Sequence, residues 1–174
     1  MKNIEVKMEI RNFRAIENIL KDVGAVSAGK MRQKDTYYHN SNGRLKIREI
    51  DHQICEIIFY KRPNKKGSKI SDYSIETVPN NQCKNIKRIY RKNYGEKVVV
   101  DKERKLWFID NTRIHLDRVK DLGTFLELET VVKDKMTEAK KEFNLVFDTL
   151  KLTTNNKIKG SYCDILLNKL KTLG

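Results

Sequence analysis

The first ten residues contain a run in which polar and apolar side chains alternate at every step. Its apolar positions are Ile4, Val6, Met8 and Ile10, and its polar positions are Asn3, Glu5, Lys7 and Glu9. Alternation with a period of two predicts a β-strand with one apolar face and one charged face. The charged face can lie in water, or it can line an enclosed cavity. The choice depends on whether other strands of the chain repeat the pattern.

Seven further segments are predicted to be strands, and several of them repeat the division into an apolar and a charged face. These segments are Lys30–Tyr38, Arg44–Ile50, Cys55–Arg62, Ile70–Val78, Val98–Ile109, Thr112–Val119 and Thr124–Val131. The predicted helices run from the N-cap Asn12 to Gly24, from Asn80 or Asn81 to about Gly95, from Thr137 to Leu150, and onward from the N-cap Ser161. These helices are amphipathic, and the apolar strand faces offer them a surface to pack on.

The charged strand faces separate by sign, with basic residues on some strands and carboxylates on others. The basic group is Lys7, Arg44, Lys46, Arg48, Lys61, Lys102, Arg104 and Arg113, and the acidic group is Glu5, Asp117, Glu127 and Glu129. Like charges enclosed together repel strongly unless a counter-ion is bound. A polyphosphate chelated to Mg²⁺ or Mn²⁺ satisfies both groups, because Arg and Lys bind phosphate oxygens and carboxylates hold such metals. A flat sheet with a solvated charged face is the alternative.

Length, composition and net charge limit the class of protein but do not identify its partner. A chain of 174 residues fits one domain, and its net charge of +14 favours an anionic partner. The chain has no apolar run long enough for a membrane span and no signal peptide, so we expect a cytoplasmic protein that does not bind membranes. Three separated cysteines without CxxC spacing favour reduced thiols, and three scattered histidines argue against a His-rich metal site.

Several motifs, in consistent order along nearly the whole chain, resemble one known family. Asn3-Ile4-Glu5-Val6-Lys7 resembles the ExExK signature of the CYTH family, also called triphosphate tunnel metalloenzymes. Similar to later family strands are Asp35-Thr36-Tyr37-Tyr38, Gly43-Arg44-Leu45-Lys46-Ile47-Arg48, Val100-Asp101-Lys102-Glu103-Arg104, Thr112-Arg113-Ile114-His115-Leu116-Asp117 and Leu122-Gly123-Thr124-Phe125-Leu126-Glu127-Leu128-Glu129. Tyr60-Lys61-Arg62-Pro63 and Lys69-Ile70-Ser71-Asp72-Tyr73 look closest to the class IV adenylyl cyclase branch.

The resemblance implies an α+β fold: one CYTH-like domain over residues 1–174, with an eight-stranded antiparallel β-barrel, a charged interior and flanking helices. The catalytic residues that it implies are Glu5 and Lys7, and the implied metal ligands are Glu5, Asp117, Glu127 and Glu129. The implied phosphate-binding residues are Lys7, Lys46, Arg48, Lys61, Lys102, Arg104 and Arg113. The chain departs from the signature at Asn3, where an amide replaces the first carboxylate and would hold a second metal less tightly.

The function implied is a Mg²⁺- or Mn²⁺-dependent reaction on a triphosphate small molecule, ATP or tripolyphosphate. The leading expectation is conversion of ATP to cyclic AMP and pyrophosphate. The enzymatic alternative is hydrolysis of tripolyphosphate, a nucleoside triphosphate or thiamine triphosphate, and the non-catalytic alternative is a module that binds polyphosphate or RNA ends. A nucleic-acid partner is not expected, because the sequence has no helix-turn-helix or aromatic RNA-binding pattern. A monomer and a homodimer remain equally open.

Overall fold

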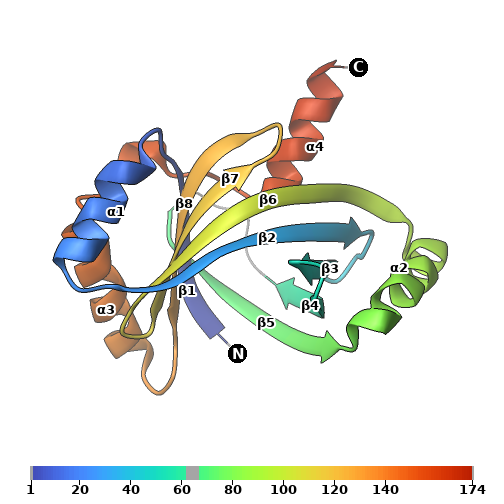
Figure 1. Cartoon of the computed structure of the whole chain (residues 1–174), viewed down its shortest axis with the longest axis horizontal. Coiled ribbons are helices and arrows are strands. Elements are labelled where there is room, and N and C mark those ends of the chain that lie inside the picture. The colour runs from blue at the N-terminus through green and yellow to red at the C-terminus, as the bar shows by residue number, and fades with distance from the viewer. Residues whose placement is uncertain (1, 62–66, 174) are drawn as a thin grey trace.

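A computed structural model of the protein describes residues 2–61 and 67–173. Eight antiparallel strands close into a barrel in the order β1-β5-β4-β3-β2-β6-β7-β8 (Figure 1). The strands are β1 Lys2–Glu9, β2 Val26–Tyr38, β3 Arg44–Ile50, β4 Ile54–Lys61, β5 Lys69–Val78, β6 Glu96–Ile109, β7 Thr112–Val119 and β8 Gly123–Val131. The eight-stranded antiparallel barrel predicted from the sequence is confirmed. The predicted strand end at Arg62 and most of the loop after it lie outside the described residues.

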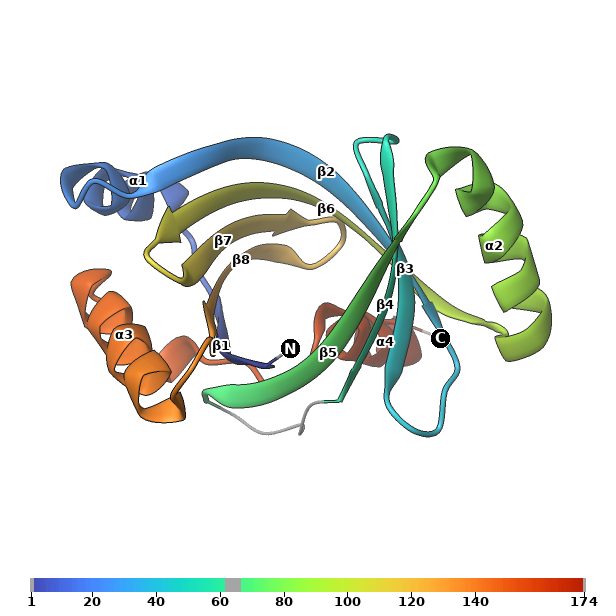
Figure 2. The same cartoon turned by 90° about the horizontal axis from the view of Figure 1, so that it is seen from below.

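Four α-helices of the described chain flank the barrel. They are α1 Phe13–Asp22, α2 Asn80–Tyr94, α3 Met136–Thr149 and α4 Tyr162–Leu173. Figures 1 and 2 show α1 and α3 together on one side of the barrel and α2 on the opposite side. None of the helices in the described part of the chain has the length and apolar content needed to cross a membrane.

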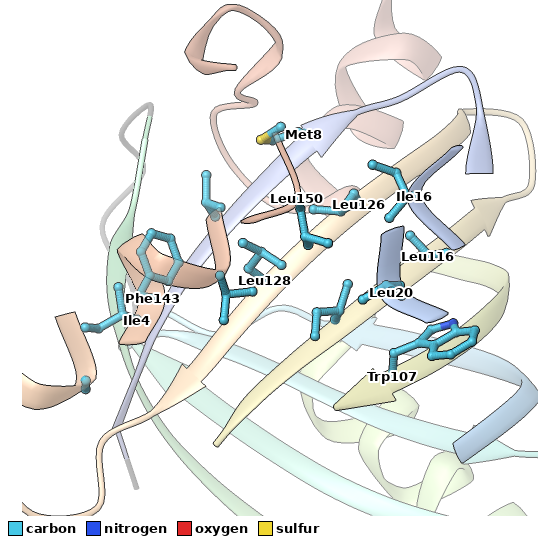
Figure 3. Close-up of a cluster of buried hydrophobic side chains, with 14 residues drawn as sticks. Ile4, Met8, Ile16, Leu20, Trp107, Leu116, Leu126, Leu128, Phe143 and Leu150 are labelled. Carbon is cyan, nitrogen blue, oxygen red and sulfur yellow. The ribbon is translucent and has the colours of Figure 1, made fainter. Parts of the chain in front are cut away.

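The main apolar core lies outside the barrel wall, between the strands and the helices α1 and α3. Ile4, Val6 and Met8 of β1 belong to one buried cluster with Leu20 of α1 and Phe143 of α3 (Figure 3). Because these side chains face the helices, the alternating polar residues of β1 face the barrel interior. The alternative of a flat sheet with a solvated charged face is therefore excluded.

Strand β2 is longer than predicted at its beginning. The sequence indicated a start at Lys30, whereas the strand begins at Val26. Pairing with β6 extends to Val26 opposite Phe108 and continues across a register shift between Ser27 and Gly29. The long partner strand therefore supplies hydrogen bonds to a segment whose own side-chain pattern does not predict a strand.

Helix α2 corrects two expectations. The predicted cap at Asn80 or Asn81 is wrong, because Pro79 is the N-cap residue and the Asn80 side chain donates a hydrogen bond to the His52 carbonyl instead. The thiols of Cys55 on β4 and Cys83 on α2 form a disulfide across a Cα–Cα distance of 5.8 Å. The expectation of three reduced cysteines is therefore wrong for this pair, whose separation of 28 residues carries no signal in the sequence. The remaining cysteine, Cys163, is free and buried.

Helix α4 packs near one end of the barrel interior. Its predicted cap at Ser161 is confirmed, since the Ser161 hydroxyl accepts a hydrogen bond from the Asp164 amide and the Asp164 carboxylate accepts one from the Ser161 amide. Tyr162, the first residue of α4, is buried in a cluster that includes Tyr37 of β2 and Val98 of β6. The helix thus covers the end of the barrel to which Tyr37 and Val98 belong.

Candidate active site

The barrel contains a cavity of about 360 Å³, lined by inward-facing side chains of all eight strands and by the beginning of α4. Its volume lies in the range of small-molecule sites. Basic residues in the lining are Lys7, Lys46, Arg48, Lys102, Arg104 and Arg113, and acidic residues are Glu5, Asp35, Glu56, Glu127 and Glu129. These charges come from strands far apart in the sequence, so the barrel closure is what brings them together.

One side of the cavity is organised around Asp35 of β2. Its carboxylate accepts hydrogen bonds from Lys46 Nζ at 2.8 Å, Arg48 Nε at 2.7 Å and Lys102 Nζ at 3.0 Å. Burial would raise the pKa of Asp35, but the three cations hold it well below its ordinary value. Burial lowers the pKa of Lys46 to about 8 and that of Lys102 to about 7, even though Asp35 opposes the shift. The buried Lys46 and Lys102 and the partly buried Arg48 thus share one carboxylate and retain capacity for another anion.

Arg104 of β6 is fixed in the middle of the site by Asp117 of β7. The guanidinium donates two hydrogen bonds of 2.6 Å to the two carboxylate oxygens, and the Tyr162 hydroxyl donates a third to the same carboxylate at 2.8 Å. Burial would raise the pKa of Asp117, yet the charge of Arg104 and its hydrogen bonds lower it to about 2. The paired carboxylate therefore stays ionised and orients the arginine.

The opposite side of the cavity carries the carboxylates of β1 and β8. The strand register places Lys7 beside Glu127 and Glu5 beside Glu129. Lys7 Nζ lies 2.5 Å from Glu127 Oε1, and Arg113 Nη2 lies 2.9 Å from Glu129 Oε2. Burial would raise the pKa of Glu127, but the charge of Lys7, the hydrogen bond with His115 and the charge of Arg104 together hold it well below its ordinary value. Both Glu127 and Glu129 are therefore ionised ligand groups at neutral pH.

His115 of β7 completes a group of three residues whose ligand atoms are close enough together to bind one cation. Ligand atoms of His115, Glu127 and Glu129 all lie within 4.8 Å of one another. Burial and the charge of Arg104 lower the pKa of His115, so its imidazole is neutral and can offer a lone pair. Nearby in the lining, the Asn3 side-chain oxygen is buried and has no hydrogen-bond partner within the described ranges. The donor set fits a divalent cation.

The structure brings most of the predicted site residues together. Those that line the cavity are Glu5, Lys7, Lys46, Arg48, Lys102, Arg104, Arg113, Glu127 and Glu129. Asp117, a predicted metal ligand, is fully buried behind Arg104 and is absent from the donor group, as is Glu5. Lys61, a predicted phosphate ligand, is exposed at the end of β4, because its inward neighbour Tyr60 occupies the cavity face.

Among the cavity residues for which the sequence predicted no site role are Gln33, Asp35, His115 and Tyr162. Gln33, Asp35 and Tyr37 occupy every second position of one predicted strand, so the sequence pattern itself places them on the same face. His115 likewise lies two residues from both Arg113 and Asp117, so it shares their face of another predicted strand. Tyr162 had no such signal, because its place depends on how α4 packs across the barrel.

Comparison with known proteins gives matches over nearly the whole chain. The family model of the CYTH domain matches residues 1–162. A protein of Methanocaldococcus jannaschii whose name proposes an adenylate cyclase is 28% identical over 179 residues, covering 95% of this chain and 98% of that protein.

Solved structures share the fold. The PH1012 protein of Pyrococcus horikoshii OT3 has a TM-score of 0.78 at 25% identity, covering 93% of this chain and 98% of its own. A Hippeastrum protein whose name proposes an adenylyl cyclase, and which is described as having a dominant triphosphatase activity, has a TM-score of 0.66 at 12% identity. That comparison covers 96% of each chain and shows a common fold.

Proposed function

The chain belongs to the CYTH domain family, and from that premise we propose that it is a divalent-metal-dependent enzyme acting on a triphosphate bound inside the barrel. The reaction that we propose is conversion of ATP to cyclic AMP and pyrophosphate, carried out by one domain spanning residues 1–174. The name of the M. jannaschii relative supports this reaction. The observation that carries the proposal is the cavity of about 360 Å³ lined by six basic side chains around clustered carboxylates.

The charge arrangement favours an enzyme over a simple polyanion-binding module. A binding module needs cations, which the Asp35 side of the cavity already supplies. Glu127 and Glu129 on the opposite wall are paired with Lys7 and Arg113, and they offset positive charge that a module binding only a bare polyphosphate would use. A metal bound by these two residues and His115 would neutralise charge on phosphate oxygens and polarise the phosphorus centre. The carboxylates of this wall therefore favour binding of the anion together with a metal.

The chain's own residues divide the work of the proposed reaction. Lys46, Arg48 and Lys102 bind phosphate oxygens, and Arg104, held by Asp117, stabilises the charge that develops on the leaving pyrophosphate. Lys7 and Glu5 lie side by side on the β1 face of the cavity. We propose that Glu5 accepts the proton of the ribose 3′-hydroxyl. The 3′-oxygen forms a bond to the α-phosphorus, and the bond from that phosphorus to the pyrophosphate oxygen breaks. Lys7 neutralises the incoming phosphate oxygens.

Hydrolysis of a triphosphate is the second candidate, and the activity described for the Hippeastrum protein favours it. Water would then replace the ribose hydroxyl as the nucleophile, in the same cavity and with the same basic residues. The two reactions differ in which phosphorus meets the nucleophile.

Product analysis separates these functions. The protein is incubated with ATP, tripolyphosphate or thiamine triphosphate, each with Mg²⁺ or Mn²⁺, and the products are resolved by chromatography. Cyclic AMP together with pyrophosphate supports the cyclase, whereas orthophosphate supports the hydrolase. Tight binding of all three compounds without any product would contradict an enzymatic function and leave the binding module.

The affinity for tripolyphosphate is expected to fall as the pH rises from about 7 to about 9. The pKa of Lys102 is lowered to about 7 and that of Lys46 to about 8, so both lose their charge over this interval in the free protein. Any proton that the ligand loses in this interval makes it more anionic and would strengthen its binding to cations, so a fall in affinity reports the lysines and not the ligand. Each lysine that must be protonated for binding weakens affinity by about tenfold per pH unit above its pKa.

Isothermal titration calorimetry at several pH values in EDTA measures this dependence. Lys102→Arg is the matched variant, because arginine stays protonated throughout the range, and it should flatten the decline. An affinity that is constant between pH 7 and 9 in the unmodified protein would show that these lysines do not bind the anion.

A further inference from the structure

One end of the cavity has an apolar lining that the charged residues do not explain. We call Met31, Gln33, Ile50 and Leu106 the mouth collar, and all four line the cavity. The register places Gln33 opposite Ile50 on β3 and opposite Lys102 on β6. Helix α4 packs on Tyr37 and its neighbours, four residues further along β2 than Gln33. The mouth collar therefore lies at the end of the cavity that α4 does not cover.

Gln33 is the polar member of the mouth collar, and its hydrogen-bonding capacity is only partly used. Its side chain is 4% exposed, and its Oε1 atom has no hydrogen-bond partner among the residues that the structure describes. Its Nε2 atom donates to a weak acceptor, the Met31 sulfur, at 3.3 Å. A buried carbonyl oxygen without a donor costs free energy. A ligand that brings an N–H donor to Gln33 would remove this cost.

The surroundings of Gln33 restrict the chemistry of that ligand. Met31, Ile50 and Leu106 provide apolar surface, which a flat heterocycle can bury and a bare polyphosphate cannot use. Gln33 also lies two residues before Asp35 on the same face of β2, so the heterocycle would adjoin the cations that bind phosphate. The cavity thus has an apolar compartment next to a phosphate compartment, as a nucleoside triphosphate requires.

Building on the proposed function, we propose that Gln33 selects adenine, so that the substrate is ATP in preference to GTP or tripolyphosphate. Adenine presents an amino donor beside the N7 acceptor, and glutamine pairs with these two groups through its Oε1 and Nε2 atoms. The corresponding edge of guanine presents two acceptors, so it leaves Oε1 without a donor. Gln33 is a specificity residue in this scheme and takes no part in bond making.

The test compares ATP, GTP and tripolyphosphate by isothermal titration calorimetry in EDTA, where metal-dependent turnover is blocked. Gln33→Met removes the amide and keeps an unbranched side chain suited to the apolar collar. We expect this variant to bind ATP about tenfold to a hundredfold more weakly, the effect of one lost buried hydrogen bond. Its affinity for tripolyphosphate should stay within about twofold, which also reports that the cavity is folded. Gln53→Met, in an exposed turn, is the matched control and should change neither affinity.

The outcomes separate this inference from the proposed function. Equal ATP affinity in the Gln33→Met variant and the unmodified protein, or equal affinity of the unmodified protein for ATP and GTP, would overturn adenine selection by Gln33. Parallel loss of ATP and tripolyphosphate binding in Gln33→Met would also overturn it, since the residue would then support the cavity as a whole. If the unmodified protein bound neither ATP nor tripolyphosphate in EDTA or with added Mg²⁺, the proposed function itself would fail.

Discussion

Glu127→Gln is expected to lower metal-dependent turnover by on the order of 10²–10³-fold, the scale seen when one preorganised charge-stabilising group is removed. Glu127 contacts three other side chains of the site, because its carboxylate lies 2.5 Å from Lys7, 3.3 Å from Arg104 and 3.4 Å from His115. Glutamine keeps the size of the side chain but removes the negative charge that would hold a metal. Turnover measured with saturating Mg²⁺ or Mn²⁺, together with direct Mn²⁺ binding by electron paramagnetic resonance, checks this expectation.

Glu76→Gln is the matched control for that substitution. Glu76 also lies on a barrel strand, but it is exposed while its neighbour Ile75 lines the cavity. The control should keep full turnover and Mn²⁺ binding, and circular dichroism should show that both variants are folded. Near-normal turnover of Glu127→Gln would remove Glu127 from the catalytic site and would count against the metal position assigned to β7 and β8.

Much of the site could be predicted because the alternation of apolar and polar residues within a strand indicates which face packs on the helices. In β1 and β8 the apolar positions, such as Val6 and Leu128, must pack on helices, so Glu5 and Glu127 are left to the interior. This reasoning uses only local alternation and the amphipathic character of the neighbouring helices. It succeeded for the residues in the middle of strands.

Local alternation fails where a side chain's environment is set by distant parts of the chain. Lys61 is a different case, because alternation with the inward residue Tyr60 places it outside the cavity and only the motif resemblance suggested a phosphate contact. Asp35 is a single carboxylate in its strand, and only the pairing of β2 with both β3 and β6 shows that it receives three cations. The disulfide between Cys55 and Cys83 depends in the same way on the docking of α2 against β4.

Asp35→Ala is expected to destabilise the free protein by about 3–5 kcal/mol, because removing one partner of a buried ion pair leaves uncompensated charge. Asp35 is 1% exposed, and the variant would leave Lys46, Arg48 and Lys102 without their shared carboxylate. For a chain of this size the melting temperature should fall by about 6–20 °C. The pKa of Asp35 is held well below its ordinary value, so its stabilisation is present above its unfolded pKa and is lost as the pH falls from about 5. Measurement at about pH 6 captures it while Lys102, whose pKa is about 7, is still mostly protonated.

The same variant tests whether these cations are a phosphate site, because an added anion can replace the missing carboxylate. Tripolyphosphate at a hundred times its dissociation constant stabilises any folded protein that binds it by about 2.7 kcal/mol. At equal ligand concentration, the rise in melting temperature should be larger for Asp35→Ala than for the unmodified protein, since the variant's cations are no longer partly neutralised. Asp101→Ala is the control, because Asp101 pairs with the exposed Arg32 on the outer barrel face and its loss should leave the melting temperature unchanged. A destabilised Asp35→Ala variant that tripolyphosphate does not rescue would show that the three cations serve the fold and do not bind phosphate.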